Sequence, residues 1–410
     1  MKNIFLFIIL PCLVHTISAQ CGAGNILLTS QSDVDNFSVN YPGCHRIMGD
    51  IEIQGDGIEN LDGLSVIDTV DRGLTIKACK DLYNIYGLKN LVIVQDFIIR
   101  NCPLIEDLMG LQSFQTASNS LGLYELELKN LVGLNRVKYI RQFAIVDCKK
   151  LQNIGGIDSL KNISTLSVSG NPILQNLEGL RKDVEISQFY LEGNANLNSL
   201  TTLDLEELYS LDVRNNAELT DLSGLSNLKK IWFLNIVRND KLLNLNSFVN
   251  LRTINNHLRI VENSNLSNIS GLKNFDSKTP DSIMILKNPS LGTCHIESIC
   301  EFLKDPISNA RIENNASECI DRKKVEENCI KTGINNNSTN NDVVYFYASN
   351  NLLNFKNLRN GSSILFFDIN GRNLYSYKAT ASELELNVSE FNSGIFFIRI
   401  DGKFVGKIIK

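Results

Sequence analysis

The sequence contains few of the residues and motifs from which enzyme active sites are built. It has four histidines in 410 residues, and His45, His257 and His295 stand far apart, without the spacing of metal ligands. No Gly-x-Ser-x-Gly elbow, phosphate-binding loop or His-Glu-x-x-His helix is present. We therefore expect a non-enzymatic protein with no metal site and no cofactor.

The sequence also lacks a strong net charge. The formal charge of −5 is mild and gives no reason to expect a nucleic-acid partner. The apolar run at residues 4–14 is too short to form a stable membrane anchor. With Lys2 before it and Ser18-Ala19 after it, this run predicts a cleaved signal peptide over residues 1–19. Lipidation at Cys21 is the alternative.

A repeated position runs through the middle of the chain, and we call its members the rungs. They are Gly55, Cys79, Cys102, Glu125, Cys148, Asn171, Asn194, Asn216, Asn239, Asn263 and Asn288. Successive rungs are 22 to 25 residues apart, a period typical of stacked supersecondary units. Apolar residues stand five and three positions before most rungs and three and six after them, and a Gly-Leu pair follows in most units. At Gly55 and Glu125 the preceding strand is shifted by one residue.

The spacing predicts the shape of each turn. Apolar residues two apart indicate a short strand with one buried face, whereas the spacing of three after the rung favours a 3₁₀-like or extended return path. About ten stacked turns would form a parallel sheet roughly 45–50 Å long at about 4.8 Å per strand. A buried Asn rung would hydrogen-bond backbone groups where the chain leaves the strand, and Cys is compact enough to replace it.

The motif Leu-x-Leu-x-x-Asn/Cys resembles leucine-rich repeats, and particularly receptor L domains, over about residues 51–293. The resemblance implies a mostly β fold, a parallel-strand solenoid closed by disulfide caps. Residues 20–50, which lead into Cys-His-Arg-Ile-Met-Gly-Asp-Ile-Glu-Ile at 44–53, resemble the N-terminal cap of such a domain. Residues 294–330 would form the C-terminal cap.

Cysteine usage indicates an exported protein. Nine cysteines follow residue 19, and Cys79, Cys102 and Cys148 are rungs, which leaves six to pair. A Cys21–Cys44 bridge would close the N-terminal cap. For the C-terminal cap we favour Cys294–Cys319 and Cys300–Cys329. A Cys79–Cys102 bridge is a lesser alternative, and the four C-terminal cysteines lack the Cys-x-x-Cys spacing of zinc sites.

The C-terminal part has a different pattern. Residues 331–343 are polar and of low complexity, which predicts a linker. Residues 344–410 contain Asn370-Gly371 and Asp401-Gly402 between apolar strands, which predicts hairpins of a small antiparallel β-sandwich. Phe-Phe-Asp-Ile-Asn-Gly-Arg at 366–372 and Asn-Ser-Gly-Ile-Phe-Phe-Ile-Arg-Ile at 392–400 resemble the type A sorting domain of the type IX secretion system of Bacteroidota.

The resemblance implies export across the outer membrane by the type IX machinery, to the medium or the cell surface. A β-sandwich with a binding role of its own is the alternative for this segment. Side chains four and two positions before each rung would form one outward face of the solenoid. The candidate ligand-binding residues on it are Lys77, Arg100, Tyr190, Glu192, Asp212, Arg214 and Arg259.

Exposed Arg and aromatic side chains are typical of protein recognition, so we expect a secreted or surface-displayed adhesion or recognition protein with a protein ligand. A glycan ligand is the second hypothesis. It would require several exposed aromatic side chains on this face, whereas the two rows offer only Tyr190. A purely structural surface-layer role is the third. The enzymatic rival is a polysaccharide-cleaving β-helix, which needs carboxylates facing each other across a cleft. Glu192 and Asp212 are available for this, but Arg214 lies beside them.

Overall fold

We describe the fold from a computed structural model of the chain. It describes residues 20–21, 24–200, 203–332, 345–349, 352–356, 358–368, 371–391 and 395–409. The predicted signal peptide and most of the predicted linker lie outside these residues. The chain divides into two compact units, Met1–Val325 and Glu326–Lys410.

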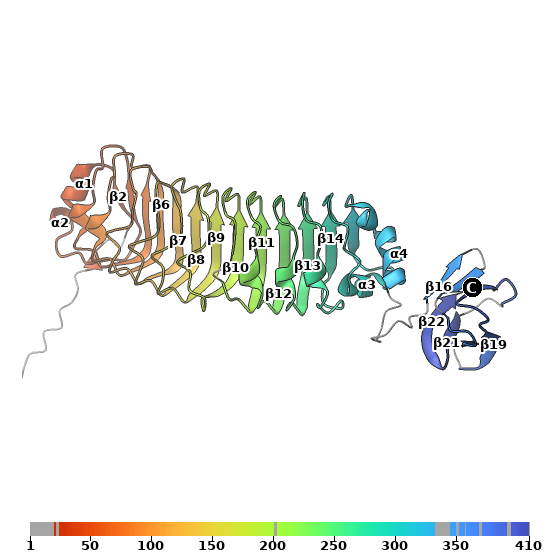
Figure 1. Cartoon of the computed structure of the whole chain (residues 1–410). Helices are drawn as coiled ribbons and strands as arrows, with labels where there is room; N and C mark the ends of the chain where they lie inside the picture. Colours follow the sequence, from red (N-terminus) through yellow and green to blue (C-terminus); the bar gives the residue numbers. More distant parts are fainter. Residues whose placement is uncertain are drawn as a thin grey trace, which may run out of the picture. The chain divides into compact units, whose positions relative to one another are not determined.

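The first unit is a coil of stacked turns, and each turn adds a strand to one long parallel sheet of fifteen strands (Figure 1). Its strands are β1 (Gln20–Cys21), β2 (Ile26–Leu28), β3 (Arg46–Ile47), β4 (Ile51–Gln54), β5 (Thr69–Lys77), β6 (Ile93–Cys102), β7 (Thr116–Leu126), β8 (Tyr139–Val146), β9 (Asn162–Ser169), β10 (Glu185–Glu192), β11 (Glu207–Arg214), β12 (Lys230–Val237), β13 (Thr253–Val261), β14 (Ser282–Leu286) and β15 (Ala310–Glu313). From β5 to β15 the order in the sheet follows the order in the sequence. The predicted mostly β fold with a parallel sheet is thus confirmed.

Helices lie at the ends of the coil and short 3₁₀ helices on its return side. They are α1 (Gln31–Asp35), α2 (Phe37–Asn40), α3 (Glu297–Leu303), α4 (Arg322–Thr332), η1 (Asp62–Leu64), η2 (Tyr86–Leu88), η3 (Ser223–Leu225), η4 (Asn246–Phe248), η5 (Ser270–Leu272) and η6 (Ser317–Cys319). The 3₁₀ return path expected from the spacing of three is therefore present. Four of these 3₁₀ helices, η1, η2, η3 and η5, contain a Gly-Leu pair of the repeat.

The strands are longer than the alternating stretch before each rung suggests. Each long strand has a second half before this stretch, and we call the point where the two halves meet the strand corner. Apolar residues five and three positions before the rung point into the core, as Leu234 and Ile236 do before Asn239. The next inward residue is not seven but eight positions before the rung, as Ile231 is. Two successive residues, Trp232 and Phe233, therefore stay outside the core. The neighbouring strand β11 has the same corner, and the pairs Leu208–Ile231 and Ser210–Phe233 on its two sides keep one register.

Directly before each rung the chain enters the left-handed region. The residues there have φ values between 51° and 65°, and they are Ala78, Asn101, Glu125, Asp147, Gly170, Gly193, Asn215, Arg238, Glu262, Lys287 and Asn314. This conformation is unfavourable for most residues other than glycine. It is maintained because the turn places the next side chain, the rung, in the core.

The rungs form a continuous hydrogen-bonded ladder. Asn239 Nδ2 donates to the carbonyls of Val213 at 2.9 Å and Val237 at 3.1 Å. Asn239 Oδ1 accepts from the backbone N–H of Asn216 at 3.2 Å. The same pattern recurs from Asn171 to Asn288, and all these side chains are fully buried. Each amide therefore satisfies backbone groups of its own turn and of the preceding one.

Two predicted rungs were wrong by one residue. Glu125 is the left-handed residue with φ 54°, and the buried rung is Leu126. Likewise Gly55 precedes the rung position, which the exposed Asp56 occupies. With this correction the apolar residues before both positions have regular spacing, so no strand is shifted. The error arose because neither true rung is Asn or Cys.

The coil extends beyond the predicted boundaries. Asn315, within the predicted C-terminal cap, is a further buried rung that accepts from the backbone N–H of Asn288 at 3.0 Å. Strand β15 lies in the same predicted cap and pairs with β14. At the other end, β1, β2 and β3 join the sheet from within the predicted N-terminal cap. Helix α4 ends at Thr332, two residues inside the segment predicted as a linker.

Glycines on the return side let adjacent turns approach closely. A Cβ built on Gly271 would lie 2.0 Å from the carbonyl oxygen of Leu245 in the preceding turn. A Cβ built on Gly87 would lie 1.7 Å from the carbonyl oxygen of Leu61. Real atoms cannot approach so closely, so these positions exclude side chains. The Gly of the Gly-Leu pair is therefore a requirement of turn-to-turn packing.

Disulfides are present at both ends of the coil, as expected. Cys21 is joined to Cys44 with a Cα–Cα distance of 5.5 Å, and Cys294 to Cys319 with 6.0 Å. Cys300 and Cys329 are also disulfide-bonded. Cys79, Cys102 and Cys148 are free and buried.

The second unit contains two antiparallel sheets. One is formed by β16 (Tyr345–Ser349), β17 (Leu352–Lys356) and β20 (Glu383–Asn387), and the other by β18 (Ser363–Phe367), β19 (Asn373–Lys378), β21 (Ile395–Ile400) and β22 (Lys403–Ile409). Hairpins β18–β19 and β21–β22 lie where the Asn-Gly and Asp-Gly pairs predict them. Its buried residues include Phe355, Phe366 and Ile398.

Candidate recognition face

The outward face of the sheet consists of the side chains four and two residues before each rung. Parallel pairing aligns them in two rows across the strands. One row contains Tyr190, Asp212, Asn235, Arg259 and Met284, and the other contains Glu192, Arg214, Val237, Val261 and Leu286. Five predicted ligand-binding residues, on β10, β11 and β13, therefore lie in one region of the face.

The other two predicted residues are remote from this region. Lys77 lies on β5 and forms an ion pair with Glu52 at 2.9 Å. Arg100 lies on β6, 3.9 Å from Glu125, with its guanidinium 5.7 Å from the centroid of the Tyr124 ring. Strand β6 is four strands from β10, which corresponds to about 19 Å. A single compact site cannot include all seven predicted residues.

Asp212 and Arg214 form a pair along β11. The Arg214 guanidinium donates two hydrogen bonds to the Asp212 carboxylate, which raises the pKa of Arg214. Asp212 is 7% exposed, so it is a buried acceptor and not an exposed surface charge. Tyr190 on the neighbouring strand donates its hydroxyl to Gln188 at 2.9 Å.

The centre of the face contains two buried polar atoms that lack partners among the described residues. They are Oδ1 of Asn235 and Nε of Arg259, which are cross-strand neighbours. Asn235 is 7% exposed, and its Nδ2 makes only a long contact, 3.4 Å, with Asp212. A buried polar atom without a hydrogen bond costs about 1–3 kcal/mol, so this arrangement is unfavourable in the free protein.

An apolar cluster adjoins these groups. Val237, Val261 and Leu286 form a cluster of their own on the outward face, and Met284 packs against it. The pKa of His257 is lowered, chiefly by burial and secondly by the nearby Arg259. The imidazole is therefore held towards its neutral form, and this part of the face combines apolar, amide and cationic groups.

Four aromatic or imidazole side chains at the strand corner were missed in the sequence. We call Tyr209, Trp232, Phe233 and His257 the aromatic corner. The ring centroids of Tyr209 and Trp232 are 5.8 Å apart, those of Tyr209 and Phe233 5.2 Å, and those of Phe233 and His257 4.8 Å. Strict alternation would bury Tyr209 and Trp232, but at the corner successive inward residues are three positions apart, and this turns both side chains outward. The sequence does contain a signal for this site. Most other turns have polar residues seven and six positions before the rung, and Tyr209, Trp232, Phe233 and His257 depart from this composition.

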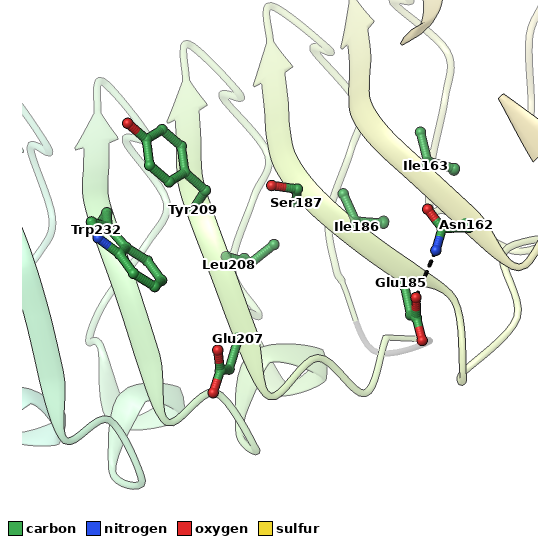
Figure 2. A pocket seen from close by; sticks show the side chains of 9 residues that line it. All are labelled: Asn162, Ile163, Glu185, Ile186, Ser187, Glu207, Leu208, Tyr209 and Trp232. Carbon is green, nitrogen blue, oxygen red and sulfur yellow. Dashed lines mark hydrogen bonds between the residues drawn. The ribbon is translucent and has the colours of Figure 1, made fainter. Parts of the chain in front are cut away.

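A hollow of about 440 Å³ lies beside the aromatic corner (Figure 2). Its polar and aromatic lining comes from Asn162, Glu185, Ser187, Glu207, Tyr209 and Trp232, on strands β9 to β12. Asn162 Nδ2 donates to Glu185 at 2.6 Å, and Lys230 Nζ lies 3.9 Å from Glu207 and 4.6 Å from the centroid of the Trp232 ring.

Comparison with known families locates the export signal. Residues 340–410 match the family described as a secretion system C-terminal sorting domain. The chain ends in a type IX sorting domain. It is therefore exported across the outer membrane to the cell surface or the extracellular space, through the type IX secretion machinery. A search of curated proteins found no match to this chain.

Within the part of the chain that the structure describes, no group of three or more His, Cys, Asp or Glu side chains could hold a metal ion. Among the same residues, no helix is both long and apolar enough to cross a membrane.

Proposed function

We propose that this exported protein is a non-enzymatic recognition or adhesion factor that binds a protein ligand on the outward face of its first unit. The part of the face concerned lies on β10 to β14. The sorting domain delivers the coil to the outside of the cell, where such a face meets foreign or neighbouring macromolecules.

We also propose that the first unit is a leucine-rich, receptor L-domain-like solenoid. Three features support this: the repeat of one strand and one rung per turn, the left-handed residue before each rung, and the 3₁₀ return path with its Gly-Leu pair. Disulfides at both ends support the comparison with capped receptor domains.

The observation that carries the binding proposal is the pair of unpartnered atoms, Asn235 Oδ1 and Arg259 Nε. They lie on the outward face between the Asp212–Arg214 pair and the apolar cluster of Val237, Val261 and Leu286. A protein ligand that supplied one donor and one acceptor here would remove the cost of both atoms. Arg is enriched in protein interfaces, and the fully buried centre of an interface is more apolar than its rim.

The same region supports a non-enzymatic role. The outward face offers Glu192 and Asp212 as carboxylates, and the Asp212 carboxylate accepts both hydrogen bonds of Arg214. Both carboxylate oxygens of Asp212 are thus engaged by a side chain of the same strand. We therefore assign Asp212 to positioning Arg214.

A capture experiment tests the proposed face. The chain from residue 20 onward would be immobilised and exposed to host, environmental and self extracts, and a captured protein would be purified. Its affinity would then be measured for the wild-type chain and for a Tyr190→Ala/Arg259→Ala variant. We expect the variant to bind at least about a hundredfold more weakly, since interface centres dominate affinity.

The matched control is Tyr86→Ala/Lys89→Ala, which removes the same classes of side chain from exposed positions at η2, on the return side. We expect this control to bind like the wild type. A captured protein whose affinity falls only in the control variant, or in neither, would contradict the assignment of the ligand to the outward face.

A further inference from the structure

We propose that the hollow beside the aromatic corner is a second binding site and that it takes a neutral oligosaccharide. It differs from the face proposed for a protein ligand, because it lies in the first halves of β9 to β12, up to and including the strand corner. Neither of its key residues, Tyr209 and Trp232, belongs to the two rows of the outward face.

The hollow exists because a row of large side chains stops abruptly. Gln188, Ser210 and Phe233 are register partners on β10, β11 and β12. The residues directly before them, Ser187, Tyr209 and Trp232, are therefore aligned as well. Figure 2 shows the short Ser187 beside the ring of Tyr209, where an aromatic neighbour would continue the row. A ligand ring with an apolar face, placed over Ser187, would continue the series that Trp232 and Tyr209 begin.

The aromatic corner is exposed in a way that indicates a ligand. Tyr209 is 45% exposed, and Trp232 and Phe233 are partly exposed. Single exposed aromatic residues are common, but a contiguous group rimmed by polar side chains marks a binding site. Tyr209 and Trp232 are stacked at an interplanar angle of 29°, so the pair presents an ordered surface.

The combination of groups favours a sugar. A pyranose ring has one face of C–H groups, whose partial positive charge suits the negative face of an aromatic ring. Its rim carries hydroxyl groups, for which Glu185 and Glu207 supply strong acceptors and Asn162 a donor. Two carboxylates in the lining disfavour a uronate or sulfated glycan. The span from β9 to β12 is about 14 Å, which suits a short oligosaccharide better than a single sugar.

The chain carries its own reporter for this site, because Trp232 is its only tryptophan. Fluorescence of Trp232 would be followed while the whole chain from residue 20 onward is titrated with neutral hexasaccharides of β-glucan, β-xylan, β-mannan and α-glucan. We expect a saturable change with at least one of them. Tyr209→Ala should weaken that binding at least about tenfold, whereas Tyr209→Phe should bind within about threefold of the wild type, because the ring is kept.

Exposed Tyr139 on β8 supplies the control, since Tyr139→Ala removes a similar side chain outside the hollow and should leave binding unchanged. Thermal unfolding of each variant would establish that it is folded. The proposal is overturned if no neutral hexasaccharide binds below about 10 mM. It is also overturned if only a hexa-arginine peptide or an oligogalacturonate gives the Tyr209-dependent change. Either result leaves the protein-binding face untouched, because Tyr190 and Arg259 are tested separately.

Discussion

At the scale of single residues, the rung amide is the side chain that holds one turn to the next. Asn239 donates to two carbonyls and accepts from the Asn216 backbone, all in the core. The ladder could be predicted from the sequence because the same residue type recurs at a fixed spacing. Leu126 and Asp56 could not be found in this way, since nothing in their chemistry marks them as rungs.

Replacing a rung amide should be costly. In Asn239→Ala, the Val213 carbonyl and the Asn216 N–H would lose their buried amide partner, and the Val237 carbonyl would keep only its bond from the Asn215 N–H, so we expect the free energy of unfolding to fall by about 3 kcal/mol. Urea unfolding would measure this. Asn250→Ala is the control, because exposed Asn250 makes one hydrogen bond, to Ser226 O at 2.8 Å, and should cost about 0.5 kcal/mol. Equal losses for the two variants would contradict the role of the ladder.

The cysteine rungs give the fold a pH dependence. Burial raises the pKa of the Cys148 thiol from its ordinary value of 9.0 to about 12. Between these values the folded chain keeps the proton and the unfolded chain loses it. The contribution of this thiol to the free energy of unfolding is thus fully present below pH 9.0. Above that pH it falls by about 1.4 kcal/mol per pH unit.

Cys148→Asn keeps the rung occupied and removes the titration. Urea unfolding from about pH 8 to about pH 10 should therefore show a shallower loss of stability in this variant than in the wild type. Cys79 and Cys102 are common to both chains, so the difference in slope reports Cys148 alone. Parallel curves would show that this thiol is not buried in the folded protein.

At the scale of elements, the sequence predicted the strand before each rung and the 3₁₀ return path, but not the strand corner. The prediction covered only the residues from five to two positions before each rung. The corner adds a second half to the longer strands and turns two successive side chains outward, as it does with Trp232 and Phe233. The aromatic corner was missed for this reason, because the alternation of inward and outward residues is interrupted there.

The return side offers a test of turn-to-turn packing. Gly271→Ala would place a methyl group about 2.0 Å from Leu245 O, so the backbone must shift. We expect unfolding to be easier by about 2–3 kcal/mol. Gly292→Ala is the matched control, because its Cβ would meet no atom within 4 Å. If calorimetry found both variants as stable as the wild type, close packing of η5 on the preceding turn would be refuted.

At the scale of the whole molecule, the chain combines an export address with a rigid surface. The repeat period predicted the parallel sheet, and the Asn-Gly and Asp-Gly pairs predicted hairpins of the second unit, because both depend on local spacing. The candidate site was less predictable. Of seven predicted residues, five lie together on β10, β11 and β13, whereas Lys77 and Arg100 lie on distant strands. The position of the site along the coil depends on which side chains from neighbouring strands come together, and the repeat pattern of a single turn does not contain this information.

The central claim is that the outward face sacrifices stability in order to bind a ligand, and Asn235 tests it most directly. Asn235→Val removes a buried acceptor without a partner and extends the apolar cluster of Val237 and Val261. We predict that this variant is more stable than the wild type by about 1 kcal/mol in urea unfolding. The same change at a paired amide, Asn263→Val, should instead cost about 3 kcal/mol.

If Asn235→Val proves less stable than the wild type, the amide serves the fold. The observation that carries the proposed function would then be lost.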